Sequence, residues 1–332
     1  MPCIRAKTGG SAIRPGVVRG DGSYAGAMLG ADSLVRASAG RVGLALCYHA
    51  VAPRAGDTVN ELVAPIGLDE FERQLDQVRR AYRPVPVSEL PAAIAARTRR
   101  DPIPIAVTFD DDLPCHVELT ADALERHDVP ATFFLSGAGL AGRREFWWQT
   151  LERAWNAGLL DTARLAGLGL GPAASLREAA ASVQALPLAD RLRVASALQE
   201  LTPPGPGDRL LDAAEIADLA ARFEVGFHTF EHDDLRTLDD GALAEAMTRG
   251  RAELEAVAGP VTTIAYPHGG ADERVARAAR AAGFAAGYRS SGGAARAGDD
   301  PFLLPRDYPH RGSAAGSARA LRRALRAAGR TR

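Results

Sequence analysis

The chain has 332 residues, of which 46% are hydrophobic and 24% charged, and its formal net charge at pH 7 is −1. These values are ordinary for a globular protein, and a charge so close to zero gives no long-range field that would attract a nucleic acid. The three cysteines form no CxxC pair, which excludes a disulfide framework. We therefore expect a globular protein without a nucleic-acid partner.

The N-terminal region differs from the rest of the chain. Residues 1–40 are rich in Gly, Ala, Ser and Arg and contain no apolar block typical of a secretory signal. We interpret them as a disordered tail, or as a misplaced start if translation begins at Met28. No stretch approaches the ~20 apolar residues that a membrane span needs. The expected location is cytoplasmic, with membrane association only if the substrate is lipid-linked.

From residue 42 onward, short apolar runs alternate with amphipathic helical segments. Candidate strands lie near residues 42–48, 104–109, 131–135, 223–227, 261–265, 284–288 and 302–306. Helices are predicted at Asp69–Tyr82, Glu118–His127, Asp239–Ala258, Asp272–Ala282 and Ser313–Ala328. This alternation favours parallel strands with helices outside. Residues 41–332 are therefore predicted to form an α/β barrel, closed or nearly closed by seven strands.

One segment, residues 137–212, interrupts the alternation between the third and fourth strands. It is too long for a simple crossover, and it contains helical stretches at 146–157, 175–186 and 188–201 before the helix-breaking run 202–207. We interpret it as a helical insertion. Its aromatic run Phe146-Trp-Trp148 is expected to anchor the insertion to the barrel, the alternative being a stacking surface for a sugar ring.

Polar side chains stand at the carboxyl ends of most of the predicted strands. In a parallel barrel these ends meet at one rim, where catalytic residues gather. The sequence therefore predicts a single site at that rim. Its candidate residues are His49 after the first strand, Asp110 and Asp111 after the second, His228 and His232 after the fourth, Tyr266 after the fifth and Arg306 after the seventh.

The aspartate pair and the histidine pair together are typical of a catalytic metal site. One carboxylate and two imidazoles bind a metal and leave a position open for water and substrate, while the second aspartate is available as a base. Neighbouring strand residues point to opposite faces, so Asp110 and Asp111 can both face the site only if the chain curls there. Taken alone, the aspartate run would be interpreted as a solvated turn, and the histidine pair as a chance occurrence on the surface. The occurrence of both in one predicted barrel favours the metal site.

Other histidines and cysteines are weaker candidates. Cys115 is a conceivable additional ligand, whereas Cys47 is interpreted as small core filler. The loop that contains His268 is expected near the site. The histidines predicted to be surface or cap residues are His116, His127 and His310.

Three motifs together resemble the polysaccharide deacetylase family, carbohydrate esterase family 4. They are Thr108-Phe-Asp-Asp111, His228-Thr-Phe-Glu-His232 and Tyr266-Pro-His-Gly269, and Ala131-Thr-Phe-Phe134 is similar to the strand after the family's first motif. The resemblance covers roughly residues 42–136 and 213–310. It implies a distorted (β/α)7 barrel that removes N-acetyl groups from an aminosugar-containing glycan or glycoconjugate. The expected partner is thus a carbohydrate with an N-acetylhexosamine unit.

The resemblance also implies roles for individual residues. By motif position Asp110 would be the general base, and Asp111, His228 and His232 would bind a divalent metal, with zinc the expected ion. The backbone N–H of Tyr266 would help to stabilise the oxyanion. His49, in Leu46-Cys-Tyr-His49, resembles the general-acid histidine that follows the first strand in exopolysaccharide deacetylases.

Two departures from the family pattern stand out. Asp112 replaces a glycine after the aspartate pair, and its charge could raise the pKa of Asp110 or add a metal ligand. The arginine that many members place before the Tyr266 loop is absent, Ile264 and Ala265 standing there. Arg306 is the candidate that would orient Asp110 instead.

Two other functions are compatible with the sequence. A related metal hydrolase would open a different amide, such as a cyclic imide or a formamide. A carbohydrate-binding barrel without turnover is the second, and the departure at Asp112 is its only support.

Overall fold

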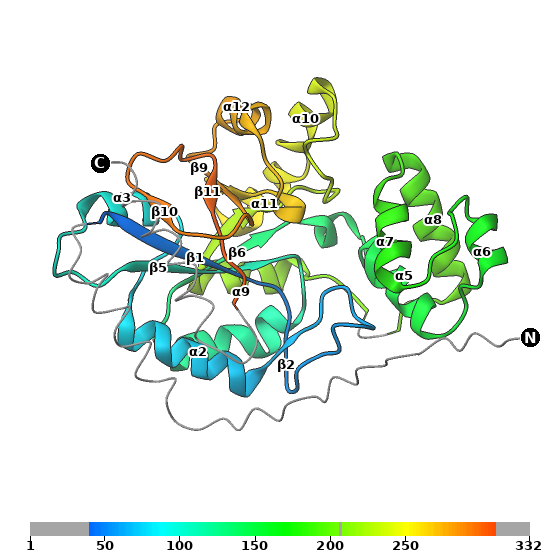
Figure 1. Ribbon diagram of the computed structural model, residues 1–332, viewed down its shortest axis with the longest axis horizontal. Helices are drawn as coiled ribbons and strands as arrows, with labels where there is room; N and C mark the ends of the chain where they lie inside the picture. Colours follow the sequence, from blue (N-terminus) through cyan, green and yellow to red (C-terminus); the bar gives the residue numbers. More distant parts are fainter. Residues whose placement is uncertain (1–39, 206–207, 310–332) are drawn as a thin grey trace, which may run out of the picture.

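The computed structural model describes residues 40–205 and 208–309. The predicted helix Ser313–Ala328, His310 and residues 1–39 of the predicted tail lie outside these ranges. Within them, a barrel of parallel strands is surrounded by helices, and a second group of helices lies beside it (Figure 1). No described helix is both long enough and apolar enough to span a membrane.

Parallel strands form the barrel wall. Asp307 closes the ring against the first of them, because its N–H donates to the carbonyl of Ala45 at 2.8 Å and its carbonyl accepts from the N–H of Cys47 at 2.9 Å. The predicted seven-stranded barrel is thus confirmed for the described residues, with each strand end within two residues of its expected place. In spatial order the strands are β1 (Val42–Tyr48), β5 (Pro104–Asp110), β6 (Ala131–Leu135), β7 (Glu224–Phe227), β8 (Thr263–Ala265), β9 (Ala286–Arg289) and β11 (Leu304–Pro305).

Short strands extend this sheet or lie next to it. β4 (Arg83–Pro84) pairs with β5, and β10 (Ala295–Arg296) runs antiparallel to β1. β2 (Val51–Ala52) and β3 (Ile66–Gly67) pair with each other in a separate two-stranded sheet. All residues of β1, β5 and β6 are buried, as expected of barrel strands covered on both faces.

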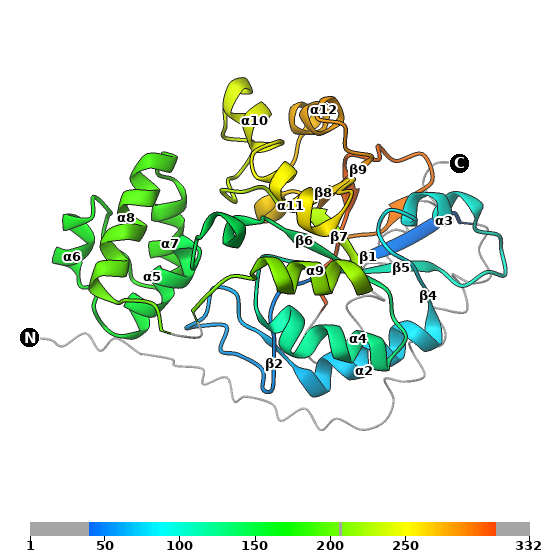
Figure 2. The same ribbon diagram turned by 180° about the vertical axis from the view of Figure 1, so that it is seen from behind.

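Helices cover the barrel on opposite sides, with α2, α4 and α9 on one side and α10, α11 and α12 on the other (Figure 2). Helices α3 and α9 were not predicted from the sequence, although Asp212 and Glu215 form a capping box at the start of α9. The helices are α2 (Leu68–Ala81), α3 (Leu90–Ala96), α4 (Ala121–Arg126), α9 (Ala213–Arg222), α10 (Asp240–Ala246), α11 (Arg251–Ala258) and α12 (Glu273–Ala281). Short helical turns are η1 (His116–Thr120), η2 (Ala138–Ala141) and η3 (Pro267–Gly269).

The single helix predicted over Asp239–Ala258 is wrong. The chain forms α10 and α11 instead, because Gly250 adopts a φ of 78° that interrupts a right-handed helix. A Cβ atom at this glycine would lie 2.6 Å from the ring of Phe230, so the close approach also requires glycine.

The segment between β6 and β7 contains α5 (Trp147–Asn156), α6 (Thr162–Gly167), α7 (Leu176–Gln184) and α8 (Leu188–Leu201), of which α6 was not expected. These helices lie to one side of the barrel (Figure 1). They bury a core of their own that includes Leu151, Val183 and Leu198. A buried ion pair between Arg191 of α8 and Asp233 connects them to the loop after β7.

Candidate active site

The backbone turns sharply after β5, at Asp111. This residue has a φ of 72°, a left-handed conformation that is unusual for any residue with a Cβ. As a result both Asp110 and Asp111 face the barrel rim, and a carboxylate oxygen of each lies 3.8 Å from Nε2 of His228. The curl that the sequence required is therefore confirmed. Such strained residues are characteristic of functional sites.

His116 stabilises this turn by contacts with its backbone, and the prediction of His116 as a surface or cap residue is wrong. The ring is fully buried, and its Nε2 lies 2.9 Å from the carbonyl oxygen of Asp111 and 3.2 Å from that of Asp110. Burial lowers the pKa of His116 to about 4, so the ring is neutral at pH 7. Because carbonyl oxygens only accept, Nε2 carries the proton and donates to them.

Three predicted ligands meet at the rim. Oδ1 of Asp111 lies 3.5 Å from Nε2 of His232 and 3.8 Å from Nε2 of His228. Two ligand atoms at about 2.1 Å from a tetrahedral zinc lie roughly 3.4 Å apart, so these spacings are close to those of a bound ion. The structure thus assembles a carboxylate and two imidazoles from the ends of β5 and β7.

The electrostatics of this triad also fit a cation. Oδ1 of Asp111 is buried without a hydrogen-bond partner in the described structure. Burial and the charges of Asp110 and Asp112 raise the pKa of Asp111 well above its usual range, so its anionic form lacks compensation. Burial lowers the pKa of His228 to about 4 and that of His232 well below its ordinary value, which leaves both rings neutral.

His228 is oriented by its other ring nitrogen. Nδ1 donates to the carbonyl oxygen of Ala265 at 2.9 Å, so the lone pair of Nε2 faces Asp111. This is the usual arrangement of a metal-binding histidine. A divalent cation would compensate the buried carboxylate and use both neutral imidazoles, so the residues fit a metal.

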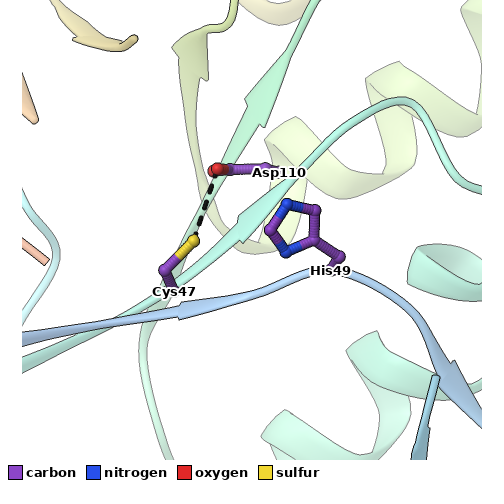
Figure 3. A group of neighbouring side chains, drawn as sticks. All are labelled: Cys47, His49 and Asp110. Atoms are coloured by element: carbon purple, nitrogen blue, oxygen red, sulfur yellow. Dashed lines mark hydrogen bonds between the residues drawn. The ribbon is translucent and has the colours of Figure 1, made fainter. Parts of the chain in front are cut away.

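A second group of ligand-type residues lies next to the first. Cys47, His49 and Asp110 have side-chain ligand atoms within 4.8 Å of one another, and the thiol of Cys47 donates to Oδ2 of Asp110 at 3.4 Å (Figure 3). This group already contains a cation, because the guanidinium of Arg306 contacts Asp110 with two hydrogen bonds of 2.5 and 2.7 Å. It therefore does not need a metal for charge balance.

Arg306 also fixes the ionisation of Asp110. Burial alone would raise the pKa of Asp110, but the charge of Arg306, with smaller contributions from His228 and His49, holds that pKa well below its usual range. Arg306 itself is completely buried. Asp110 is consequently an oriented carboxylate that stays ionised at neutral pH.

His49 follows β1 and lines the cavity beside Asp110 (Figure 3). Its ring lies parallel to that of Tyr308, with 6.1 Å between centroids. Burial lowers the pKa of His49, and the negative charge of Asp110 partly offsets this effect. The structure therefore brings His49 together with the aspartate pair and the metal ligands.

The backbone N–H of Tyr266, by contrast, is not available to a substrate. It donates to the carbonyl oxygen of Tyr288 at 3.0 Å within the sheet, and the buried phenol donates to the carbonyl of Phe302. The prediction for Tyr266 is therefore wrong, since β8 continues its pairing one residue further than expected. The following loop residues His268 and Gly269 line the cavity instead.

Asp112 is a structural residue rather than an additional ligand. Its buried carboxylate accepts from the N–H of Ser136 at 2.7 Å, from the hydroxyl of Ser136 at 2.5 Å and from the N–H of Ala138 at 3.1 Å. These bonds connect the ends of β5 and β6. Its charge contributes to the raised pKa of Asp111, whereas the pKa of Asp110 is lowered, not raised, which corrects both expectations for Asp112.

A cavity of about 320 Å³ opens above these side chains. Phe146 and Trp148 stack at 4.3 Å and pack with Ala138 and Leu210, in agreement with the expected anchoring role. Trp148 also lies 4.5 Å from the ring of His232 and lines the cavity. Cys115 belongs to neither ligand group of the described residues. The cavity is lined by His49, Leu62, Val63, Asp110, Asp111, Trp147, Trp148, Ala180, Ala181, Gln184, His228, His232, His268, Gly269 and Tyr308.

Comparisons with known proteins agree with this geometry. The sequence model of the family described as polysaccharide deacetylase matches residues 97–163 and 211–287. No curated protein matches the chain. Among solved structures, the Streptococcus pyogenes deacetylase PplD is 15% identical, with a TM-score of 0.57 over 86% of this chain and 98% of its own. IcaB from Ammonifex degensii is 21% identical, with a TM-score of 0.55 over 86% of this chain and 97% of its own. At these identities the structures establish the fold.

Proposed function

Because this chain belongs to the polysaccharide deacetylase family, we propose that it hydrolyses the N-acetyl groups of an aminosugar-containing glycan or glycoconjugate in the rim cavity. One observation carries the proposal. The metal-type triad of Asp111, His228 and His232 and the ionised base Asp110 face one cavity of about 320 Å³. Amide hydrolysis needs both an electrophile and a base, and here they stand side by side.

We propose that Asp111, His228 and His232 hold a divalent ion, and that the ion is zinc. Two neutral imidazoles and one carboxylate are the ligands that zinc prefers in catalytic sites. When bound, the ion supplies Lewis-acid polarisation of the amide carbonyl and lowers the pKa of a water molecule. The buried and unpartnered Oδ1 of Asp111 supports this assignment.

Asp110 serves as the general base. It accepts a proton from the attacking water as the water oxygen bonds to the amide carbon. Arg306 keeps the carboxylate ionised and fixes its orientation through two hydrogen bonds, while the thiol of Cys47 adds a weaker one. A group already ionised and held in place needs no rearrangement at the moment of proton transfer.

His49 serves as the general acid. Its protonated ring donates to the amine nitrogen as the carbon–nitrogen bond breaks, which releases acetate and a free amino group. The protonated fraction of His49 falls as pH rises, so turnover should decline on the alkaline side. Because burial lowers the pKa of His49, this decline should begin at a lower pH than for an exposed histidine. His49→Gln should slow acetate release at unchanged metal content; full turnover would contradict this role.

The oxyanion donor comes from the loop after β8. The N–H groups of Tyr266, Gly269 and Gly270 are engaged with carbonyl oxygens, which leaves that of His268 among the loop residues beside the cavity. His268 has a φ of 56°. His268→Gly keeps the N–H and relieves the strain, so it should retain turnover, whereas a large loss would assign the role to the imidazole ring.

The direct test is acetate release from N-acetylglucosamine oligomers, measured before and after removal and return of the metal. We expect activity with metal, none after chelation, and recovery when zinc returns. A parallel panel of a formamide and a cyclic imide addresses the alternative substrates. Hydrolysis of one of these without acetate release from the oligomers would overturn the proposal.

A further inference from the structure

The two histidines of the ligand triad are held in different ways. Nδ1 of His228 donates to the carbonyl oxygen of Ala265, and the backbone N–H of His228 donates to the carbonyl of Leu135 at 2.9 Å, so the barrel fixes this ring. Nδ1 of His232, by contrast, is buried and has no hydrogen-bond partner among the described residues. Metal-binding histidines usually donate this second nitrogen to a neighbour, which orients the ring. His232 must therefore be oriented by other contacts.

His232 also has an unusual backbone conformation. Its φ is 54°, and Thr229 in the same loop has a φ of 57°, both in the left-handed region that residues with a Cβ rarely adopt. The ring of His232 contacts those of Trp148 and His268, at centroid distances of 4.5 and 4.7 Å, and Nε2 of His268 lies 3.2 Å from its carbonyl oxygen. Strained backbone persists only where the surrounding structure holds it, so the loop needs firm attachments on both sides of His232.

Ion pairs supply these attachments directly before and after His232. Glu231 pairs with Arg143 at 2.6 Å. Asp233 pairs with Arg191, and both members of this second pair are buried. The chain is thus tied at the residue on each side of the proposed metal ligand.

The pair between Arg191 and Asp233 joins two different parts of the molecule. Arg191 lies in α8, within residues 164–210, which the family model does not match, whereas Asp233 lies in a matched segment. Removing both charges from water costs about as much as their attraction returns, so a buried ion pair contributes little net stability. In some proteins such a pair is retained because it fixes one arrangement of the chain. Here the fixed arrangement is that of the loop containing His232.

We propose that Arg191 is a positioning residue for the metal site. Through Asp233 it holds the loop backbone so that His232 faces Asp111, and the affinity for the metal thereby depends on the helical insertion. This inference rests on the proposed metal triad. Nε2 of His232 lies 3.5 Å from Oδ1 of Asp111, close to the spacing of two zinc ligands. Once Asp233 is released, the loop can relax toward unstrained backbone angles, which moves the ring away from Asp111.

Zinc affinity, measured by competition with a chromophoric chelator, tests the proposal without turnover. Arg191→Met removes the cation and keeps an unbranched side chain, and we expect zinc to bind about 10–100-fold more weakly, the usual cost of losing a residue that orients a metal ligand. Asp233→Asn should have a similar effect. The double variant leaves no unpaired buried charge that could unfold the chain, and it should lose no more affinity than either single variant, because the two residues act as one unit.

Two further variants of α8 are controls that leave the pair intact. Arg193→Met removes an exposed arginine that pairs with Asp190 on the same helix. Leu198→Ala leaves a cavity in the core of the insertion and should lower the free energy of unfolding. Both should bind zinc as the unsubstituted chain does. If Leu198→Ala weakens zinc binding as much as Arg191→Met, the role of Arg191 is merely structural and the proposal is wrong.

Arg191→Lys is the rescue experiment. Nη2 of Arg191 donates to Oδ1 of Asp233, and a lysine ammonium can make the same bond. Arg191→Lys should therefore bind zinc more tightly than Arg191→Met. Equal affinities in these two variants would mean that the charge at this position does not hold the loop, which would overturn the proposal.

Zinc binding and acetate release separate this inference from the proposed function. Unchanged zinc affinity in Arg191→Met and Asp233→Asn overturns the inference, even if the unsubstituted enzyme releases acetate. A 10–100-fold loss of zinc affinity in both variants, with no acetate release by the zinc-loaded unsubstituted chain, supports the inference and overturns the proposed function.

Discussion

The site contains two neighbouring groups of ligand-type side chains that differ in one respect. Asp111, His228 and His232 form one group, and Cys47, His49 and Asp110 form the other, both with ligand atoms within 4.8 Å of one another. In the second group the guanidinium of Arg306 neutralises the carboxylate. In the first, Oδ1 of Asp111 has no partner among the described residues.

This difference explains why Asp110 and Asp111 have different chemical roles. A buried carboxylate requires a compensating charge, and whichever cation is present decides what the carboxylate does. Arginine is built into the fold and makes Asp110 a fixed, ionised base. No arginine among the described residues pairs with Asp111, so an ion from solution is the natural partner. Adjacent residues in the sequence thus acquire separate roles from their surroundings.

The largest effect is expected from His228→Ala. Without this imidazole the carboxylate and His232 make a two-ligand site, and we expect loss of both the bound metal and the activity. Elemental analysis and acetate release measure the two. His127→Ala, at a partly exposed ring outside the site, is the control. If His228→Ala kept its metal, the assignment of Asp111, His228 and His232 as the metal ligands would be wrong.

The next largest effect is expected from Asp110→Asn, which should change turnover without changing metal binding. The metal ligands are untouched, so metal content should stay near that of the unsubstituted enzyme. Turnover should fall by about 10²–10⁴-fold, the usual contribution of a general acid or base. Loss of metal together with activity would show instead that Asp110 belongs to the ligand set.

Arg306→Met sharpens the comparison by removing the cation of the second group. Asp110 is then a buried charge without a partner, which should lower the free energy of unfolding by about 3–5 kcal/mol. The freed carboxylate, with His49 and Cys47, should take up a second zinc ion in excess metal. Metal stoichiometry and chemical denaturation measure the two effects.

The control for this variant is Arg126→Met, which removes a surface ion pair with Glu72. We expect a change of about 0–1 kcal/mol and no additional metal. If Arg306→Met still binds a single ion, the reason given for the absence of a second metal is wrong.

How well the fold and the site could be predicted from the sequence depends on the kind of interaction that each residue makes. Strands β1, β5 and β6 were predicted almost to the residue because barrel strands are continuous apolar runs. The ligand triad and Arg306 were found because they stand directly after strands. His116 was missed because its contacts are with backbone carbonyls, which leave no mark in the pattern of side chains.

Other errors also arise from tertiary contacts. Nothing in the sequence shows that the N–H of Tyr266 pairs with Tyr288, since that bond depends on the register of β8 and β9. The break between α10 and α11 depends on the approach of Phe230 to Gly250, which a helical periodicity does not reveal. The role of Asp112 likewise depends on Ser136 at the end of β6.

The smallest predicted effect concerns His116 and pH. Its pKa of about 4 in the folded protein is below the ~6.5 of an exposed histidine, so the unfolded chain binds a proton that the folded chain does not. The stability that His116 contributes is therefore complete above pH 6.5 and is lost as pH falls toward 4, by at most about 1.4 kcal/mol per unit.

His116→Asn should remove this part of the acid dependence. Unfolding of metal-free protein by urea, repeated between pH 7 and 4, measures the slope, and His127→Asn is the control. Equal slopes for the unsubstituted chain and His116→Asn would mean that the ring is not held neutral in the folded state.

The measurement that tests the central claim most directly is anomalous X-ray scattering at the zinc edge from crystals grown with excess zinc. The account predicts one strong peak within about 2.0–2.2 Å of Asp111, His228 and His232. It predicts no peak between Cys47, His49 and Asp110, where Arg306 already supplies the charge. A peak at that second group, or none at the first, would contradict it.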